Sequence, residues 1–118
     1  MPIYEVPRVN WVQELNRFTT AHEGWLVSLE ILGPYLGAQP EIDNMPLLGV
    51  SADRVNHDGA IAISVVRSAD HFTHIVHDVS RIFIEQTHDG ATAALLIEST
   101  DATRTVLQLR AVGSLPET

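Results

Sequence analysis

Alternation between apolar and polar residues, repeated in several short segments, is the feature of this sequence that most restricts its fold. The alternation is clearest in residues 25–32, 60–66 and 104–110, where large apolar side chains occupy every second position. A period of two places those side chains on one face of an extended chain, so each segment predicts a strand buried on one side. Residues 81–86 and 94–98 are more continuously apolar, which is typical of more deeply buried strands.

Short turn sequences separate these segments. Asp58-Gly59 and Asp89-Gly90 each provide the dipeptide that favours a tight hairpin turn, and residues 99–103 form a polar break of hairpin length. Strands joined in this way lie next to one another as an antiparallel meander. The sequence therefore predicts a small antiparallel meander barrel or curled sheet of roughly five to seven strands.

A helical pattern precedes the strands, over about residues 10–22. Its apolar side chains recur at helical spacing and form one stripe, consisting of Trp11, Leu15 and Phe18. Asn10 is a favourable N-cap, and Gln13 three residues later completes a capping-box pattern. Gly24 is well placed to end the helix. The aromatic stripe predicts that this helix packs on the sheet.

Together these patterns predict an α+β fold that is mainly β, with the N-terminal amphipathic helix covering an opening of the sheet. The chain of 118 residues fits a single domain, with a β-rich part at residues 25–112 and a frayed tail at residues 113–118. Besides the helical stripe, the expected core consists of Trp25, Val27, Leu29, Ile61, Ile63, Phe83, Leu95, Ile97, Leu107 and Leu109.

Charge and composition exclude several classes of function. The formal net charge is −8, all seven basic residues are arginines, and cysteine is absent. An acidic chain without a basic cluster repels the phosphates of nucleic acid and of anionic membranes, so neither is an expected partner. The absence of cysteine and lysine excludes disulfides, thiolate chemistry and Schiff-base catalysis. No signal-peptide pattern and no apolar run of membrane-spanning length is present, and we expect a cytoplasmic protein.

Three closely spaced histidines are the most suggestive candidates for a functional site. They are His71, His74 and His77, and an aspartate stands on each side of the group. Their β-favouring neighbours indicate a strand, in which His74 points away from the other two and His71 lies about 20 Å from His77. A metal site built on these histidines therefore needs a ligand from another strand, such as Glu85 or Glu98.

A second candidate site is the connection over residues 33–46. This segment is rich in glycine and proline and carries the exposed-looking side chains Tyr35, Leu36 and Ile42. An irregular loop of this length is typical of either a surface crossover packed by its own side chains or a binding surface. The sequence leaves both interpretations open.

No residue pattern indicates catalysis or a cofactor. Ser51 lacks the second glycine of a nucleophile elbow, and no glycine-rich phosphate loop precedes the helix. Glu85 and Glu98 could act as acid–base groups only if one of them were partly buried. We therefore predict no catalytic residue and no cofactor.

A series of short motifs runs along nearly the whole chain: Trp11 with Leu15, Gly24-Trp25, and residues 36–39, 46–51, 71–74 and 84–87. In this order the motifs resemble those of a family of short uncharacterised bacterial proteins, a domain of unknown function. The resemblance implies a stand-alone domain of bacterial type. It implies no activity, cofactor or catalytic residue.

The expected function is that of a non-enzymatic protein-interaction module, which binds itself as a dimer because the single helix cannot cover every edge of a sheet. Two alternatives stay open. One is a protein that binds a small ligand or a divalent metal through the strand histidines. The other is an enzyme with an acid–base site of histidine and glutamate.

Overall fold

The computed structural model of the chain describes residues 2–34, 37–52 and 59–110. One short strand precedes the helix, and the other strands follow it. In chain order the elements are β1 (Ile3–Val6), the 3₁₀ turn η1 (Arg8–Asn10), α1 (Trp11–His22), β2 (Leu26–Gly33), β3 (Gly37–Ala52), β4 (Ile61–Arg67), β5 (Asp70–Val76), β6 (Val79–Gln86), β7 (Thr92–Ser99) and β8 (Arg104–Arg110).

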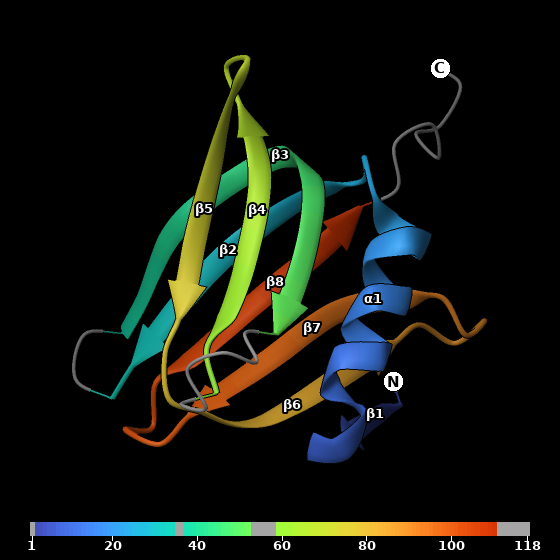
Figure 1. The fold of residues 1–118 in the computed structure, drawn as a ribbon, viewed down its shortest axis with the longest axis vertical. Helices are drawn as coiled ribbons and strands as arrows, with labels where there is room; N and C mark the ends of the chain where they lie inside the picture. The colour runs from blue at the N-terminus through green and yellow to red at the C-terminus, as the bar shows by residue number, and fades with distance from the viewer. Residues whose placement is uncertain (1, 35–36, 53–58, 111–118) are drawn as a thin grey trace.

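The described strands form one antiparallel sheet of eight strands, in the order β1-β6-β7-β8-β2-β3-β4-β5. The sheet curls around the core without closing into a barrel, and α1 lies alongside the curl (Figure 1). This arrangement confirms the predicted α+β, mainly β fold in its curled-sheet form, with eight strands where five to seven were expected. β1 and β3 are the two strands that the sequence did not predict.

The prediction of an irregular connection over residues 33–46 is wrong. From Gly37 onward these residues belong to β3, a strand of 16 residues whose first part pairs with β2 and whose second part, from Leu47, pairs with β4. No described strand pairs with the other side of the first part, so it forms a free edge of the sheet. Strands tolerate proline at such edges, which explains why Pro40 and Pro46 do not interrupt β3.

The core lies inside the curl, where the inward faces of the strands meet α1. It contains the helical stripe and most of the predicted sheet residues. Three of the predicted core residues are only half-buried, namely Trp25, Phe83 and Leu109. Phe83 lies between the buried Ile82 and Ile84, so the alternation of the strand turns its ring to the outer face. There the Arg81 guanidinium lies 5.0 Å from the ring centre.

A close contact between α1 and β3 holds the helix in place. The Thr19 hydroxyl accepts a hydrogen bond from the Val50 N–H (2.9 Å) and donates one to the Val50 carbonyl (3.0 Å). A Cβ added at Gly49 would stand only 3.1 Å from Thr19 Cγ2, so glycine permits this approach. The expected capping box does not form, since the Asn10 side chain makes no cap hydrogen bond. The helix ends before Gly24, as predicted, and this glycine adopts φ +88°.

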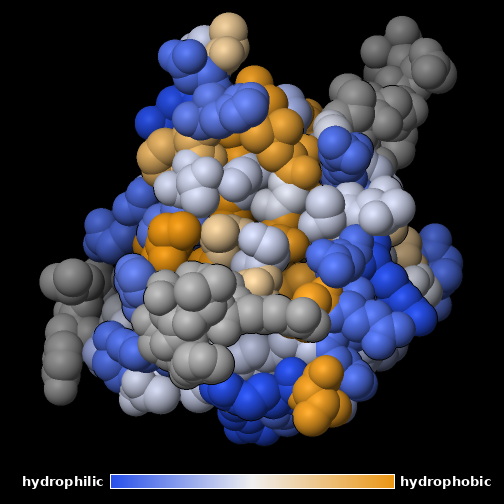
Figure 2. All heavy atoms as spheres, viewed as in Figure 1, coloured by the Kyte–Doolittle hydropathy of each residue, from blue (hydrophilic) through white to orange (hydrophobic). Residues whose placement is uncertain are grey.

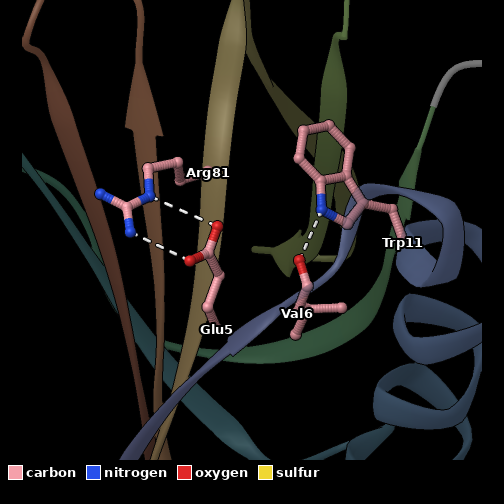
Figure 3. Close-up of polar contacts among 4 residues, drawn as sticks. All are labelled: Glu5, Val6, Trp11 and Arg81. Carbon is pink, nitrogen blue, oxygen red and sulfur yellow. Dashed lines mark hydrogen bonds and ion pairs between the residues drawn. The ribbon is translucent and has the colours of Figure 1, made fainter.

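Side chains fasten the N-terminal strand β1 to the edge of β6 (Figure 3). Arg81 of β6 donates two hydrogen bonds to the Glu5 carboxylate, at 3.0 and 3.3 Å. These hydrogen bonds hold the pKa of the Glu5 carboxyl below its usual range. The Trp11 indole N–H donates to the Val6 carbonyl at 3.0 Å and ties the strand to the start of α1. β1 therefore covers the β6 edge and forms one border of the sheet.

Candidate functional site

The predicted histidines lie on and beside β5, the strand at the other border of the sheet. His71 lies opposite Val66 of β4 on the outer face and is exposed. His74 lies opposite Ile63 on the core-facing side and is half-buried. His77 follows the end of β5 and is exposed. The opposite orientation of His71 and His74 agrees with the strand geometry expected from the sequence.

Cross-strand pairing does not bring the expected metal ligands to these histidines. Glu85 and Glu98 belong to β6 and β7, whereas β5 pairs only with β4 in the described part of the sheet. Glu98 lies instead 3.7 Å from the Arg104 guanidinium. Within the described ranges, no group of three or more histidine, aspartate or glutamate residues could hold an ion. We therefore propose no metal site.

The second candidate site is only partly described. Tyr35 and Leu36 lie outside the described residues. The expectation that Ile42 is exposed is wrong, because its side chain is 2% exposed and belongs to the core. Ile42 lies on β3 opposite Leu29 of β2, beside a register shift near which Asn44 adopts φ 52°. Strand pairing, rather than a loop, decides where this side chain points.

β5 has the properties of an unprotected sheet edge. All seven of its residues pair with β4 without a register shift, and it contains no proline and no lysine. The hairpin turn before it consists of Ser68 and Ala69, with φ of 48° and 73°, the left-handed pair that a two-residue type I′ turn requires. The side of its backbone away from β4 has no partner strand in the part of the chain that the structure describes.

Apolar and aromatic side chains accompany this free backbone. Ile75 is 42% exposed on the outer face. Phe72 is half-buried, and the Arg67 guanidinium covers its ring at 4.1 Å from the ring centre. The exposed Thr73 shares a hydroxyl–hydroxyl hydrogen bond of 2.9 Å with Ser64 of β4. The edge thus offers apolar contact area next to backbone groups that pair with no described strand.

The described residues of the outer face beside this edge include no arginine, aspartate or glutamate. It consists of Gly49 and Ser51 from β3, Ala62, Ser64 and Val66 from β4, and His71, Thr73 and Ile75 from β5. Where no grey residues cover it, the middle of this side of the molecule is mainly pale and orange in Figure 2, with the strongly hydrophilic residues mostly around its margins. A groove of about 370 Å³ separates the face from α1, and Asn16 of the helix forms part of its wall. The face is therefore a surface that another acidic molecule can approach.

The carboxyls with displaced pKa values lie away from β5. A hydrogen bond from the Thr87 hydroxyl lowers the pKa of Asp89, and one from the Thr103 backbone N–H lowers the pKa of Asp101. Both aspartates stabilise exposed hairpin turns and do not mark a reactive site.

Sequence reasoning did not identify β5 as an edge strand. Whether a strand lies at an edge depends on the order of all strands in the sheet, and that order is not a local property. Asp70–Val76 lacks proline, but so do β2, β4, β6, β7 and β8, so no local signal distinguishes this edge strand from the others.

Comparisons with other proteins extend the resemblance found in the sequence. An uncharacterized protein of Aquifex aeolicus (strain VF5) is 25% identical over 112 residues, which cover 95% of this chain and 96% of the relative. No solved structure shows significant similarity to the chain. The model of a family of unknown function, DUF5335, matches residues 3–118. This match covers almost the whole sequence and confirms the predicted resemblance: the chain belongs to the DUF5335 family.

Proposed function

We propose that this protein is a non-enzymatic self-association module and that two copies join through the free edge of β5. The observation that carries the proposal is a regular strand of seven residues at the border of the sheet, with no partner on one side among the described residues. The unpaired N–H and C=O groups of such an edge are a template for a further strand. The occupant of this edge is a second copy of the chain.

The other free edges are protected against pairing. β1 has only four residues and stands between Pro2 and Pro7. The first part of β3 contains Pro40 and Pro46, and a register shift interrupts it near Asn44. Short length, proline and bulges are the usual devices that prevent edge-to-edge association. β5 has none of them, and this contrast supports β5 as the contact.

Charge supports a second copy as the occupant. Two molecules with a net charge of −8 repel each other over most of their surfaces. The described residues of the outer face beside β5 carry no formal charge, so two copies can meet over them without desolvating acidic groups. A cationic partner would require acidic residues at the contact, and β5 offers only Asp70 at its beginning. Contact at the β5 edge also removes Ile75 from water, which favours association.

The size of the contact sets the expected affinity. Stable interfaces bury roughly 1,200–2,000 Å² in total, and pairing of two short strands with their neighbouring side chains falls at or below the lower limit. We therefore expect a reversible dimer with a dissociation constant on the order of micromolar. We further propose that it acts in the cytoplasm, with which the absence of cysteine for disulfide bonding is compatible. No described helix has the length and apolar character needed to cross a membrane.

Sedimentation velocity over protein concentrations from low micromolar to several hundred micromolar tests the proposal. The wild-type chain is expected to shift from monomer to dimer over this range. Ile75→Lys places a charge on the exposed side of β5 and is expected to weaken the dimer by about tenfold or more. The change also makes the net charge less negative, so general repulsion between acidic molecules predicts the opposite result.

Ile3→Lys is the matched control. It makes the same substitution on β1, at the other border of the sheet, where the wild-type side chain is 54% exposed compared with 42% for Ile75. This variant is expected to dimerise like the wild type. A wild-type chain that remains monomeric at several hundred micromolar overturns the proposal, as does a dimer that Ile3→Lys dissociates and Ile75→Lys does not.

A further inference from the structure

We infer that the two β5 strands pair antiparallel about a twofold axis that passes between the two copies of Thr73. This inference rests on the proposed self-association at β5 and adds its register. Most small homodimers have a single twofold axis, so that the same surface of each copy meets its equivalent. For two identical edge strands in one continuous sheet, that axis stands perpendicular to the sheet, and the strands run antiparallel.

Strand geometry then restricts the possible registers. Directly opposed residues of an antiparallel pair point to the same face of the sheet. Successive residues of one strand point to opposite faces, and the perpendicular axis preserves the faces. A residue can therefore oppose only its own equivalent or a residue an even number of positions away. The axis must consequently pass through a residue position, and Phe72, Thr73 and His74 are the central candidates.

The length of overlap selects Thr73 among these positions. β5 extends from Asp70 to Val76, so Thr73 is its middle residue. An axis at Thr73 pairs all seven residues of each strand. An axis at Phe72 or His74 leaves two residues at one end of each strand without a partner, and their backbone groups then stay unpaired. The central register therefore satisfies the largest number of backbone groups.

Side-chain pairs in the central register are compatible with burial. On the outer face the exposed Ile75 of each copy meets the exposed His71 of the other, and the two Thr73 side chains meet at the axis. On the inner face each half-buried Phe72 meets a half-buried His74, which gives two aromatic cross-strand pairs. No two carboxylates oppose each other. An axis at His74 would instead bring Asp70 of each copy toward Asp78 of the other.

Cysteine crosslinking tests the register without interference from native thiols, because the wild-type chain has no cysteine. Opposed residues of an antiparallel pair have Cα atoms about 4.5–5.5 Å apart, which lies within the range that a disulfide can bridge. Thr73→Cys alone is therefore expected to form a covalent dimer under mild oxidation. His71→Cys and Ile75→Cys are expected to crosslink when mixed and not alone, because equivalent residues of either variant lie about 14 Å apart along the strands.

The outcomes separate the register from the self-association itself. A shifted register predicts other heterodimers, namely His71→Cys with Thr73→Cys or Thr73→Cys with Ile75→Cys, and mass spectrometry identifies each one by its mass. Either of these as the dominant product overturns the central register while the proposed dimer stands. Thr20→Cys on the exposed side of α1 measures random collision. Crosslinking of all three β5 variants at the rate of Thr20→Cys, together with a monomer in sedimentation, overturns both proposals.

Discussion

Replacing Thr19 by valine tests how α1 is attached to the sheet. The Thr19 hydroxyl makes two hydrogen bonds to Val50, one to its N–H and one to its carbonyl, at a partly buried site. Each intramolecular hydrogen bond contributes about 0.5–1.5 kcal/mol to stability, and a buried N–H left without a partner costs more. Valine has the same shape and nearly the same helix propensity, so packing and propensity change little. We expect Thr19→Val to lower the free energy of unfolding by about 2 kcal/mol.

Urea unfolding at one fixed protein concentration measures this loss, because self-association makes stability depend on concentration. The midpoint is expected to fall while the slope stays unchanged. In thermal unfolding the same loss corresponds to a decrease of about 8 °C in Tm for a chain of this size. Thr19→Ser keeps the hydroxyl and is expected to retain most of the stability. It loses the Cγ2 methyl that faces Gly49.

Thr20→Val is the matched control for this experiment. It makes the same exchange one residue later, on the exposed side of α1, where substitutions usually change stability by less than about 0.5 kcal/mol. A Thr19→Val variant as stable as Thr20→Val would refute the reasoning. It would mean that water or another group satisfies the Val50 backbone without the helix.

Two further changes test local features of the sheet. Ala69→Gly is expected to raise the free energy of unfolding by about 1 kcal/mol, because alanine is strained at its φ of 73°. The control Ala62→Gly, inside β4, is expected to lower the free energy of unfolding by a similar amount. Urea unfolding of both variants measures the difference. Glu5→Gln tests the ion pair with Arg81: the lowered pKa of Glu5 adds stability above the ordinary glutamate range, near about 4.3, and this stability is lost as the pH falls through the folded-state pKa. The wild type is therefore expected to be more stable than Glu5→Gln at neutral pH, and this difference is expected to shrink as the pH falls through the folded-state pKa. A difference in stability that does not depend on pH contradicts a contribution from the ion pair.

Local periodicity was enough to predict the helix and five of the strands. The expected helix at residues 10–22 corresponds to α1, and the segments that alternate at period two correspond to β2, β4 and β8 within one residue at each end. The more continuously apolar segments lie inside β6 and β7. These patterns arise from neighbouring residues that share a face, so they can be read without knowing the tertiary structure.

Proline misled the prediction of β3, and no pattern in the sequence predicted β1. Pro2 and Pro7 flank β1, and Pro40 and Pro46 lie within β3, where a proline is ordinarily a sign against a strand. Both strands are free edges over these residues, and a free edge has no ladder hydrogen bond to lose. Whether a strand is an edge depends on contacts between distant parts of the chain. Because such long-range contacts cannot be read from neighbouring residues, Ile42 was expected at the surface.

The candidate site shows the same division between local and long-range information. The sequence predicted correctly that His71 and His74 point to opposite faces, because alternation along one strand decides this orientation. It did not indicate that β5 is the last strand of the sheet, nor that Ser64 of β4 shares a hydrogen bond with Thr73. Both facts depend on which strands are neighbours in the sheet. The sequence therefore identified this segment by its histidines, whereas the structure identifies it as an edge strand.

The free edges of the sheet also explain the position of α1. β2 pairs with β3 only as far as Pro46, and the chain from Thr19 to Trp25 continues along the edge of β3 that follows. The Trp25 carbonyl and the Gly24 N–H pair with the Leu47 backbone, each at 2.8 Å, and the Thr19 hydroxyl then pairs with both backbone groups of Val50. A threonine side chain thus takes the place of a strand, which accounts for a β-branched residue in the last turn of α1. On β5 no described side chain or strand performs this task, and that difference is the physical reason to expect a second copy there.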